Sequence, residues 1–127
     1  MAKILIAEDD ALSQRFVGTI VERLGHSAVL SLDGQHAWEA LCAETHFDML
    51  ITDIMMPRMD GTTLIRTLRA DQRFSTIPIV IMSAFIGVKD IAALLEIGAT
   101  WFLPKPVERG TLEDYINRAL AMTKKQL

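Results

Sequence analysis

The chain has 127 residues and a mass of 14.2 kDa, which is enough for one domain of ordinary size and too little for two. Half of the residues are hydrophobic and 23% are charged, so the composition is that of a globular domain and excludes a disordered chain. The formal net charge is −3 and no cluster of lysine and arginine dominates, which argues against a nucleic-acid-binding surface. The acidic groups are concentrated early, because residues 1–60 carry 10 acidic and 4 basic side chains.

Cysteine usage and hydropathy indicate the compartment. The single cysteine, Cys42, excludes an intrachain disulfide and fits a reducing environment. The longest uncharged stretch, residues 74–88, is shorter than the roughly 20 apolar residues of a membrane-spanning helix. The apolar run at residues 4–7 is followed at once by three acidic residues, unlike a signal peptide. We therefore expect a cytoplasmic protein without membrane insertion.

Short apolar runs alternate with segments of helical periodicity along the whole chain. The runs occupy residues 3–7, 28–32, 49–52, 79–82 and 101–103, and apolar residues recur at helical spacing around 12–24, 37–41, 64–68, 88–95 and 112–120. Gly25 and Gly98 are predicted to end the first and fourth helices, the former as a left-handed cap. Thr111 and Asp114 resemble a capping box at the start of the last helix. We expect one domain over residues 1–123 and a short tail over 124–127.

The continuous apolar character of the five runs indicates the fold class. Strands of this kind are buried on both faces, which is typical of a parallel sheet covered by helices on both sides. The pattern therefore predicts an α/β fold of five strands alternating with five helices. In such a sheet, ligands bind beyond the carboxyl ends of the strands, so the residues that end the runs are the first candidates for chemistry.

Those terminal residues are polar and complementary in charge. The first run ends at Glu8, Asp9 and Asp10, the third at Asp53 and the fourth at Ser83, and the fifth leads into Lys105. An acidic cluster, a hydroxyl and an ammonium group are thus expected at one edge of the sheet. We interpret Asp10 as the cap of the first helix rather than as a ligand.

The chemistry of this set points to phosphoryl transfer. Two carboxylates about 4–5 Å apart repel by roughly 3–4 kcal/mol at an effective dielectric of 20, so either one is protonated or a hard cation lies between them. Oxygen ligands with open positions favour Mg²⁺, and Mn²⁺ accepts the same ligands in vitro. A lysine and a serine can bind phosphoryl oxygens. An aspartate can accept the phosphoryl group covalently.

Four segments carry a family resemblance, and the resemblance extends over essentially the whole chain. They read ILIAEDD at residues 4–10, FDMLITDIMMPRMDG at 47–61, IVIMSA at 79–84 and GATWFLPKP at 98–106. The chain resembles the response-regulator receiver domains of two-component signalling, chemotaxis receivers included. The resemblance implies a flavodoxin-like, doubly wound (βα)5 fold with strand order 2-1-3-4-5 and helices on both faces of the sheet.

The resemblance also implies a role for each site residue. Asp53 would be the phosphoacceptor. Mg²⁺ would be bound directly by Asp9, Asp53 and the backbone carbonyl of Met55, and Glu8 would act on its water shell. Ser83 and Lys105 would contact the phosphoryl oxygens, and Phe102 would be the aromatic side chain that changes rotamer on phosphorylation. Met55 and Phe85 occupy positions that tune the lifetime of the acyl phosphate, and we expect Phe85 to shield it from water. The Lys105–Pro106 peptide bond would be cis.

The implied function is that of a phosphorelay switch. A histidine kinase or a histidine phosphotransfer protein would donate the phosphoryl group, and a downstream protein would bind the face formed by the fourth helix, fifth strand and fifth helix. The chain would catalyse its own phosphorylation and dephosphorylation without turning over an external substrate. It would be a monomer or a phosphorylation-dependent dimer and would make no direct contact with nucleic acid.

Two alternatives belong to other classes of function. A degenerate receiver would act only as an interaction module, but that role does not require the complete set Glu8, Asp9, Asp53, Ser83 and Lys105. A Mg²⁺-dependent aspartyl phosphatase of the haloacid-dehalogenase type would need a second aspartate two residues beyond the nucleophile. That position holds Met55, so the general acid for a leaving group is missing.

Overall fold

The computed structural model describes residues 1–44, 46–84 and 87–125 and confirms the predicted alternation of strands and helices. The described part of the chain also contains one short 3-10 helix, η1, that the periodicity did not predict. In chain order the elements are β1 (Lys3–Ala7), α1 (Ala11–Arg23), β2 (Ser27–Ser31), α2 (Gly34–Ala43), β3 (Met49–Asp53), α3 (Gly61–Arg69), η1 (Gln72–Phe74), β4 (Ile79–Ser83), α4 (Val88–Glu96), β5 (Trp101–Pro104) and α5 (Arg109–Lys125).

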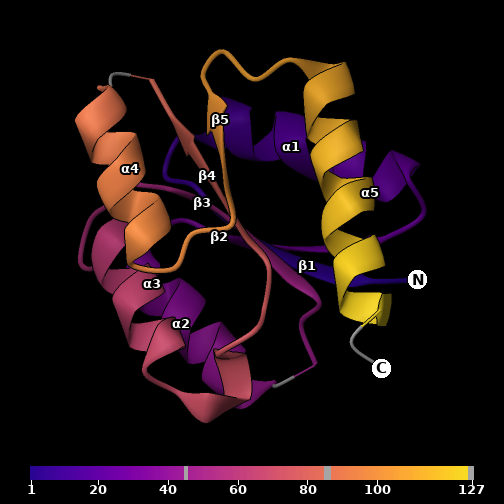
Figure 1. Ribbon diagram of the computed structural model, residues 1–127. Helices are drawn as coiled ribbons and strands as arrows, with labels where there is room; N and C mark the ends of the chain where they lie inside the picture. Colours follow the sequence, from indigo (N-terminus) through magenta and orange to yellow (C-terminus); the bar gives the residue numbers. More distant parts are fainter. Residues whose placement is uncertain (45, 85–86, 126–127) are drawn as a thin grey trace.

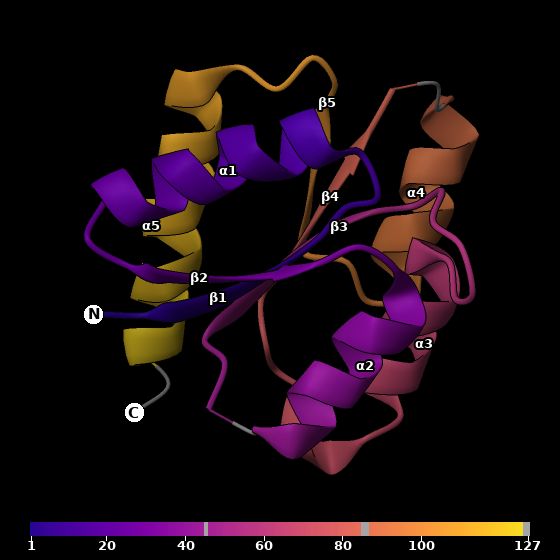
Figure 2. The ribbon, with the colours of Figure 1, turned by 180° about the vertical axis from the view of Figure 1, so that it is seen from behind.

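The five strands form one parallel sheet in the order β2-β1-β3-β4-β5, as expected. Helices α1 and α5 cover one face of this sheet, and α2, α3 and α4 cover the other (Figures 1 and 2). The fold is therefore the flavodoxin-like, doubly wound class. Within the described residues, no helix combines the length and the apolar character needed to cross a membrane.

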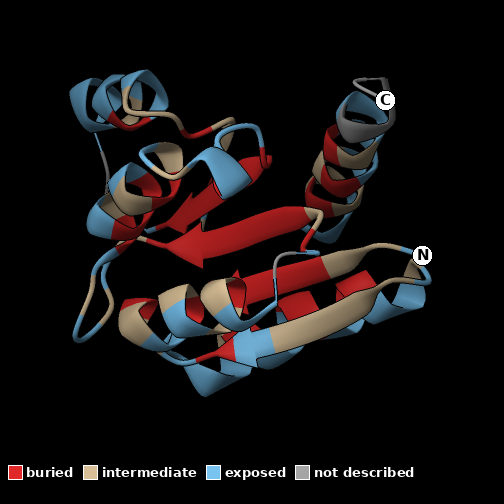
Figure 3. Ribbon diagram, turned by 90° about the horizontal axis from the view of Figure 1, so that it is seen from below, coloured by how far each residue is buried: buried red, intermediate tan, exposed pale blue. Residues whose placement is uncertain are grey.

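Two apolar cores flank the sheet because successive side chains of a strand point to opposite faces. Leu5 and Leu50 pack with the buried residues of α2 and α3, whereas Ile4 and Ile51 pack with those of α1 and α5. Strands β3 and β4 are buried along their whole length, while the edge strand β2 is mostly half-buried (Figure 3). The central strands thus give the site at their carboxyl ends a rigid base.

The helix termini confirm some of the predicted signals and correct one. Gly25 and Gly98 have positive φ angles of 91° and 126° directly after α1 and α4, as helix-ending glycines do. Asp10 caps α1 by accepting a hydrogen bond from the Ser13 backbone N–H. The predicted capping box at Thr111 is wrong, because α5 begins earlier, at Arg109. The Glu108 side chain accepts hydrogen bonds from the N–H groups of Gly110 and Thr111. Helix α5 continues through residues 124 and 125, which were expected to lie in the tail.

A close backbone approach fixes the position of α3 beneath the end of β3. The Gly61 N–H donates to the Ile54 carbonyl at 2.8 Å. A Cβ atom at Gly61 would lie 2.2 Å from the Asp53 carbonyl oxygen, which belongs to a buried strand and cannot give way easily. The absence of a side chain at residue 61 is therefore required for this packing.

We expect Gly61→Ala to lower the free energy of unfolding by about 2 kcal/mol, the usual scale for an overpacked site. Urea denaturation measured by circular dichroism tests this value. Gly18→Ala is the matched control, since its Cβ, in the middle of α1, would meet only the ends of the Leu30 and Ile6 side chains, at 3.4 and 4.0 Å. Alanine there should stabilise the protein by about 0.5–1 kcal/mol. Equal effects of the two substitutions would contradict this account.

Candidate functional site

Three carboxylates meet at the carboxyl edge of the sheet. Glu8 follows β1 directly and Asp53 is the last residue of β3, and these strands are adjacent. Carboxylate oxygens of Glu8, Asp9 and Asp53 all lie within 4.8 Å of one another. Glu8 is fully buried and Asp53 is 8% exposed, whereas Asp9 is exposed. The cluster therefore has two inner carboxylates and one at the surface.

The Lys105 side chain bridges the inner pair of carboxylates. Its Nζ donates to Asp53 Oδ2 at 2.7 Å and makes a short hydrogen bond to Glu8 Oε1. Lys105 follows the edge strand β5, so its long side chain crosses the end of β4 to reach these carboxylates. The repulsion between the two carboxylates is thus offset by an ammonium group from the chain itself, which the sequence reasoning did not foresee. The Lys105–Pro106 peptide bond is cis, as expected.

The remaining oxygens of the inner carboxylates are bound by backbone N–H groups. Glu8 Oε2 accepts from the Asp10 N–H at 3.0 Å, and Asp53 Oδ1 accepts from the Ile54 N–H at 2.6 Å. The buried Gln14 side chain donates to the carbonyls of Glu8 and Ser31, at 3.3 and 2.9 Å. The position of Gln14, a polar residue on the otherwise apolar face of α1, was the signal in the sequence that could have predicted these hydrogen bonds. The site is preorganised on the β1, β3 and α1 side.

Burial and charge act in opposite directions on the titration of this pair. Burial raises the pKa of Glu8 above its ordinary value, and the nearby Asp53 charge adds to this, while the Lys105 ammonium and the Asp10 N–H oppose it. Burial also acts to lower the pKa of Lys105, but its hydrogen bonds to Asp53 and Glu8 outweigh that effect, so the pKa is raised. Lys105 is therefore positively charged at neutral pH, and its charge opposes the increase that burial causes in the pKa of Glu8.

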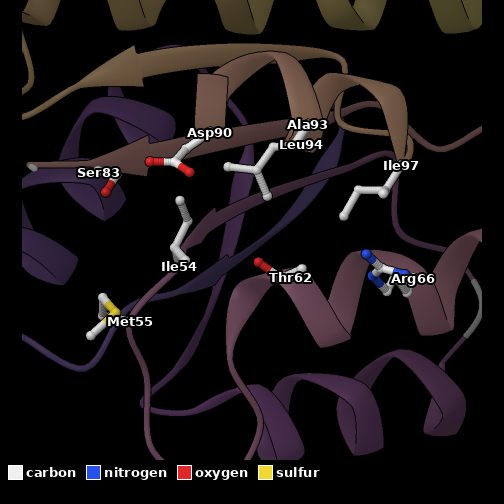
Figure 4. Close-up of a pocket in the computed structure, with 9 residues that line it drawn as sticks. All are labelled: Ile54, Met55, Thr62, Arg66, Ser83, Asp90, Ala93, Leu94 and Ile97. Atoms are coloured by element: carbon white, nitrogen blue, oxygen red, sulfur yellow. The ribbon is translucent and has the colours of Figure 1, made fainter. Parts of the chain in front are cut away.

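Ser83 and Met55 line a groove between α3 and α4 that adjoins this cluster (Figure 4). Ser83 is the last residue of β4 and is 6% exposed, and its carbonyl accepts the Lys105 N–H at 2.9 Å. The Met55 side chain is 76% exposed, and it also lines a second cleft with Asp9, Met56 and Asp60. The groove thus extends from the ends of β3 and β4 along α4 to Ile97.

Phe102 lies within the edge strand and not at its carboxyl end. It is half-buried on β5, pairs with Ile81 in the register of the sheet and packs against the core beneath α2, α3 and α4. Phe85 lies outside the described residues. Arg58 forms an ion pair with Asp33 beside the β3–α3 loop, an interaction that no spacing in the sequence predicted.

The comparisons with known proteins agree with this fold and site. The family model described as "Response regulator receiver domain" matches residues 4–117. The chain is 33% identical to the chemotaxis protein CheY1 of Helicobacter pylori over 119 residues, which cover 93% of this chain and 96% of that protein.

Solved structures give the same result. The signal receiver domain of a signal transduction histidine kinase from Syntrophus aciditrophicus has a TM-score of 0.89 and 31% identity, over 98% of this chain and 93% of that one. The chemotaxis response regulator CheY4 of Vibrio cholerae has a TM-score of 0.86 and 27% identity, over 94% and 99%. A parallel five-stranded sheet that carries a carboxylate cluster and a lysine at its edge is the architecture of a signalling receiver. The chain belongs to the response-regulator receiver domain family of two-component signalling.

We expect Lys105→Met to lower the free energy of unfolding by about 3 kcal/mol at pH 7 in EDTA, because it leaves the buried Glu8 carboxylate without a cation. The pKa of Glu8 in the folded variant would then rise further. A carboxyl group whose pKa is higher in the folded than in the unfolded protein favours folding when it is protonated. For Glu8 this contribution is complete below the pKa of the unfolded state, near 4.5, and is lost as the pH increases. The deficit relative to wild type should therefore shrink between pH 7 and pH 4.5, as measured by urea denaturation.

Lys3→Met is the matched control, since Lys3 forms an ion pair with the exposed Glu44. That pair should contribute less than about 1 kcal/mol. A deficit of Lys105→Met that is the same at both pH values would contradict the assignment of the Lys105 charge to Glu8.

Proposed function

We propose that this chain is a phosphoacceptor receiver, in which Asp53 takes a phosphoryl group from a phosphohistidine of a histidine kinase or histidine phosphotransfer protein. The observation that carries the proposal is the ammonium group of Lys105 hydrogen-bonded to Asp53 within a cluster of three carboxylates. This arrangement concentrates a nucleophilic oxygen and a phosphate-binding cation in one place. Positioning and charge neutralisation are the main requirements of phosphoryl transfer.

The donor set fits Mg²⁺. All three side chains offer carboxylate oxygens, and these lie close enough together for one ion. Asp9 and Asp53 would bind the ion directly with the backbone carbonyl of Met55, and Glu8 would act on its water shell. Mn²⁺ would bind the same oxygens. A bound divalent cation supplies positive charge that lowers the repulsion between the carboxylates and an incoming phosphoryl group.

The transfer step involves one bond formed and one broken. A carboxylate oxygen of Asp53 attacks phosphorus, and the bond from phosphorus to the donor imidazole nitrogen breaks with its electron pair left on that nitrogen. Lys105 Nζ already donates to Asp53 Oδ2, and it would donate to an oxygen of the phosphoryl group after the transfer. The Ser83 hydroxyl, at the end of the adjacent strand β4, would donate to another of these oxygens. Water later reverses the modification by hydrolysis.

The switch would pass from Ser83 to Phe102 and to the surface formed by α4, β5 and α5. Helix α4 supports this role, because Leu94 is its only buried residue among those described. A helix held by so little burial can change position at low energetic cost. A downstream protein would bind the changed surface, and the chain would be a monomer or a phosphorylation-dependent dimer. We take residues 1–123 as the receiver unit, 124–127 as a tail and the cytoplasm as its compartment.

Intact mass spectrometry with Mg²⁺ and acetyl phosphate tests the proposal. We expect a gain of one phosphoryl group that requires Mg²⁺, is removed by hydroxylamine and is absent from Asp53→Ala. Asp114→Ala, which removes an exposed aspartate on α5, should be modified like wild type. Modification of Asp53→Ala at another residue would refute the site. If wild type gains nothing from acetyl phosphate or from a phosphohistidine donor, the chain is an interaction module only.

Met55 and Phe85 are proposed to tune the lifetime of the acyl phosphate. Both are apolar, and the exposed Met55 side chain beside Asp9 and Ser83 supports a role in limiting the access of water. We expect Phe85→Ala and Met55→Ala to accelerate dephosphorylation, measured by the decay of the phosphorylated mass after donor removal. Met122→Ala, which removes another exposed methionine, should leave the rate unchanged. Unchanged rates in both site variants would contradict the proposal.

A further inference from the structure

The loop between β3 and α3, residues 54–60, is anchored at both ends. At its carboxyl end the Gly61 N–H donates to the Ile54 carbonyl at 2.8 Å, which closes the loop on itself. Residues 55 and 56 lie between these anchor points and line the cleft that also contains Asp9 and Asp60. The backbone of this metal-site loop therefore borders directly on the carboxylate cluster.

A second contact reaches this loop from outside the carboxylate site. Arg58 Nε donates to Asp33 Oδ2 at 3.1 Å. The other oxygen of the same carboxylate, Oδ1, accepts the His36 N–H at 2.7 Å and caps α2. Asp33 is thus fixed to a helix terminus by one oxygen and to the metal-site loop by the other. This geometry links α2, which lies outside the carboxylate cluster, to the loop that carries Met55.

The backbone on both sides of this contact is unusual. Arg58 has a φ of 66°, and among the described residues it is the only one other than glycine with a positive φ. Non-glycine residues adopt this conformation rarely, and they do so where surrounding contacts impose it. The backbone of Gly34, the first residue of α2, also lies very close to the 54–60 loop, because a Cβ at Gly34 would lie 1.8 Å from the Met59 carbonyl oxygen. The two loops are therefore packed backbone against backbone.

We propose that the Asp33–Arg58 pair is a positioning brace for the metal-site loop, and that it keeps the Met55 carbonyl where Mg²⁺ binding requires it. This inference rests on the proposed function, since it assigns the brace to the same Mg²⁺ site. Neither residue is expected to contact the ion or the phosphoryl group. Both act through the position of the loop backbone.

Charge alone predicts the opposite sign, which makes the inference testable. Arg58 is a positive charge near a cation site, so its removal would tighten Mg²⁺ binding if only long-range electrostatics mattered. If the pair positions the loop, its removal weakens Mg²⁺ binding, because the loop of the variant is less ordered and must be ordered each time the ion binds. A loss of affinity in Arg58→Gln therefore cannot come from the charge change.

Isothermal titration of the metal-stripped protein with MgCl₂ measures the effect. We expect Arg58→Gln to raise the Kd for Mg²⁺ about threefold. Asp33→Asn should do the same while keeping the α2 cap, since asparagine caps helices as well as aspartate does. The double variant should be no weaker than either single variant, because both remove one interaction. Arg118→Gln is the matched control, because Arg118 Nε binds Asp114 at 3.0 Å on the remote helix α5, and its Kd should equal that of wild type.

The outcomes separate the brace from the site itself. If wild type does not bind Mg²⁺, or if Asp53→Asn binds as tightly as wild type, the proposed Mg²⁺ site is wrong. If wild type binds but Arg58→Gln binds equally or more tightly, the brace is wrong and the proposed function stands. A lower thermal midpoint of Arg58→Gln without Mg²⁺, together with an unchanged Kd, would assign the pair to stability alone and would also overturn the inference.

Discussion

The placement of Lys105 between two buried carboxylates is the interaction on which the site depends. Parallel strands deliver Glu8 and Asp53 to the same edge of the sheet, where burial makes their mutual repulsion costly. The ammonium group of Lys105 donates hydrogen bonds to both and offsets part of this repulsion. In the function proposed above, the same group would bind a phosphoryl oxygen. One interaction therefore serves both the stability of the resting state and the proposed chemistry.

The cluster of Glu8, Asp53 and Lys105 has rigid surroundings on the side of β1 and β3 and looser packing on the side of α4. Backbone N–H groups and the buried Gln14 bind the carboxylates and carbonyls at the ends of β1 and β3. On the opposite side, Leu94 is the only buried residue of α4 among those described, and the Arg69 guanidinium donates to the Gly98 carbonyl just beyond the carboxyl end of this helix.

Sequence patterns predicted the structure correctly where it depends on residues close together in the chain. The apolar runs, the helix-ending glycines and the cap at Asp10 were confirmed because propensity, burial and capping act over a few residues. The predicted start of α5 was wrong because the chain offers two capping side chains three residues apart. The Glu108 carboxylate accepts the N–H groups of Gly110 and Thr111, so the helix begins before Thr111. Capping patterns identify the neighbourhood of a helix end better than its first residue.

The class of fold, the order of its elements and the residues that end each strand could be predicted from the sequence, because strands of continuous apolar residues are typical of a sheet covered on both faces. The parallel arrangement also predicted that the acidic residues, Ser83 and Lys105 lie at one edge. Which of these groups are in contact became clear only from the folded structure. That the Lys105 ammonium bridges Glu8 and Asp53, and that Arg58 binds Asp33, depends on the strand order and on loop conformations set by contacts 25 to 97 residues apart. Such distances leave no periodic trace in a sequence.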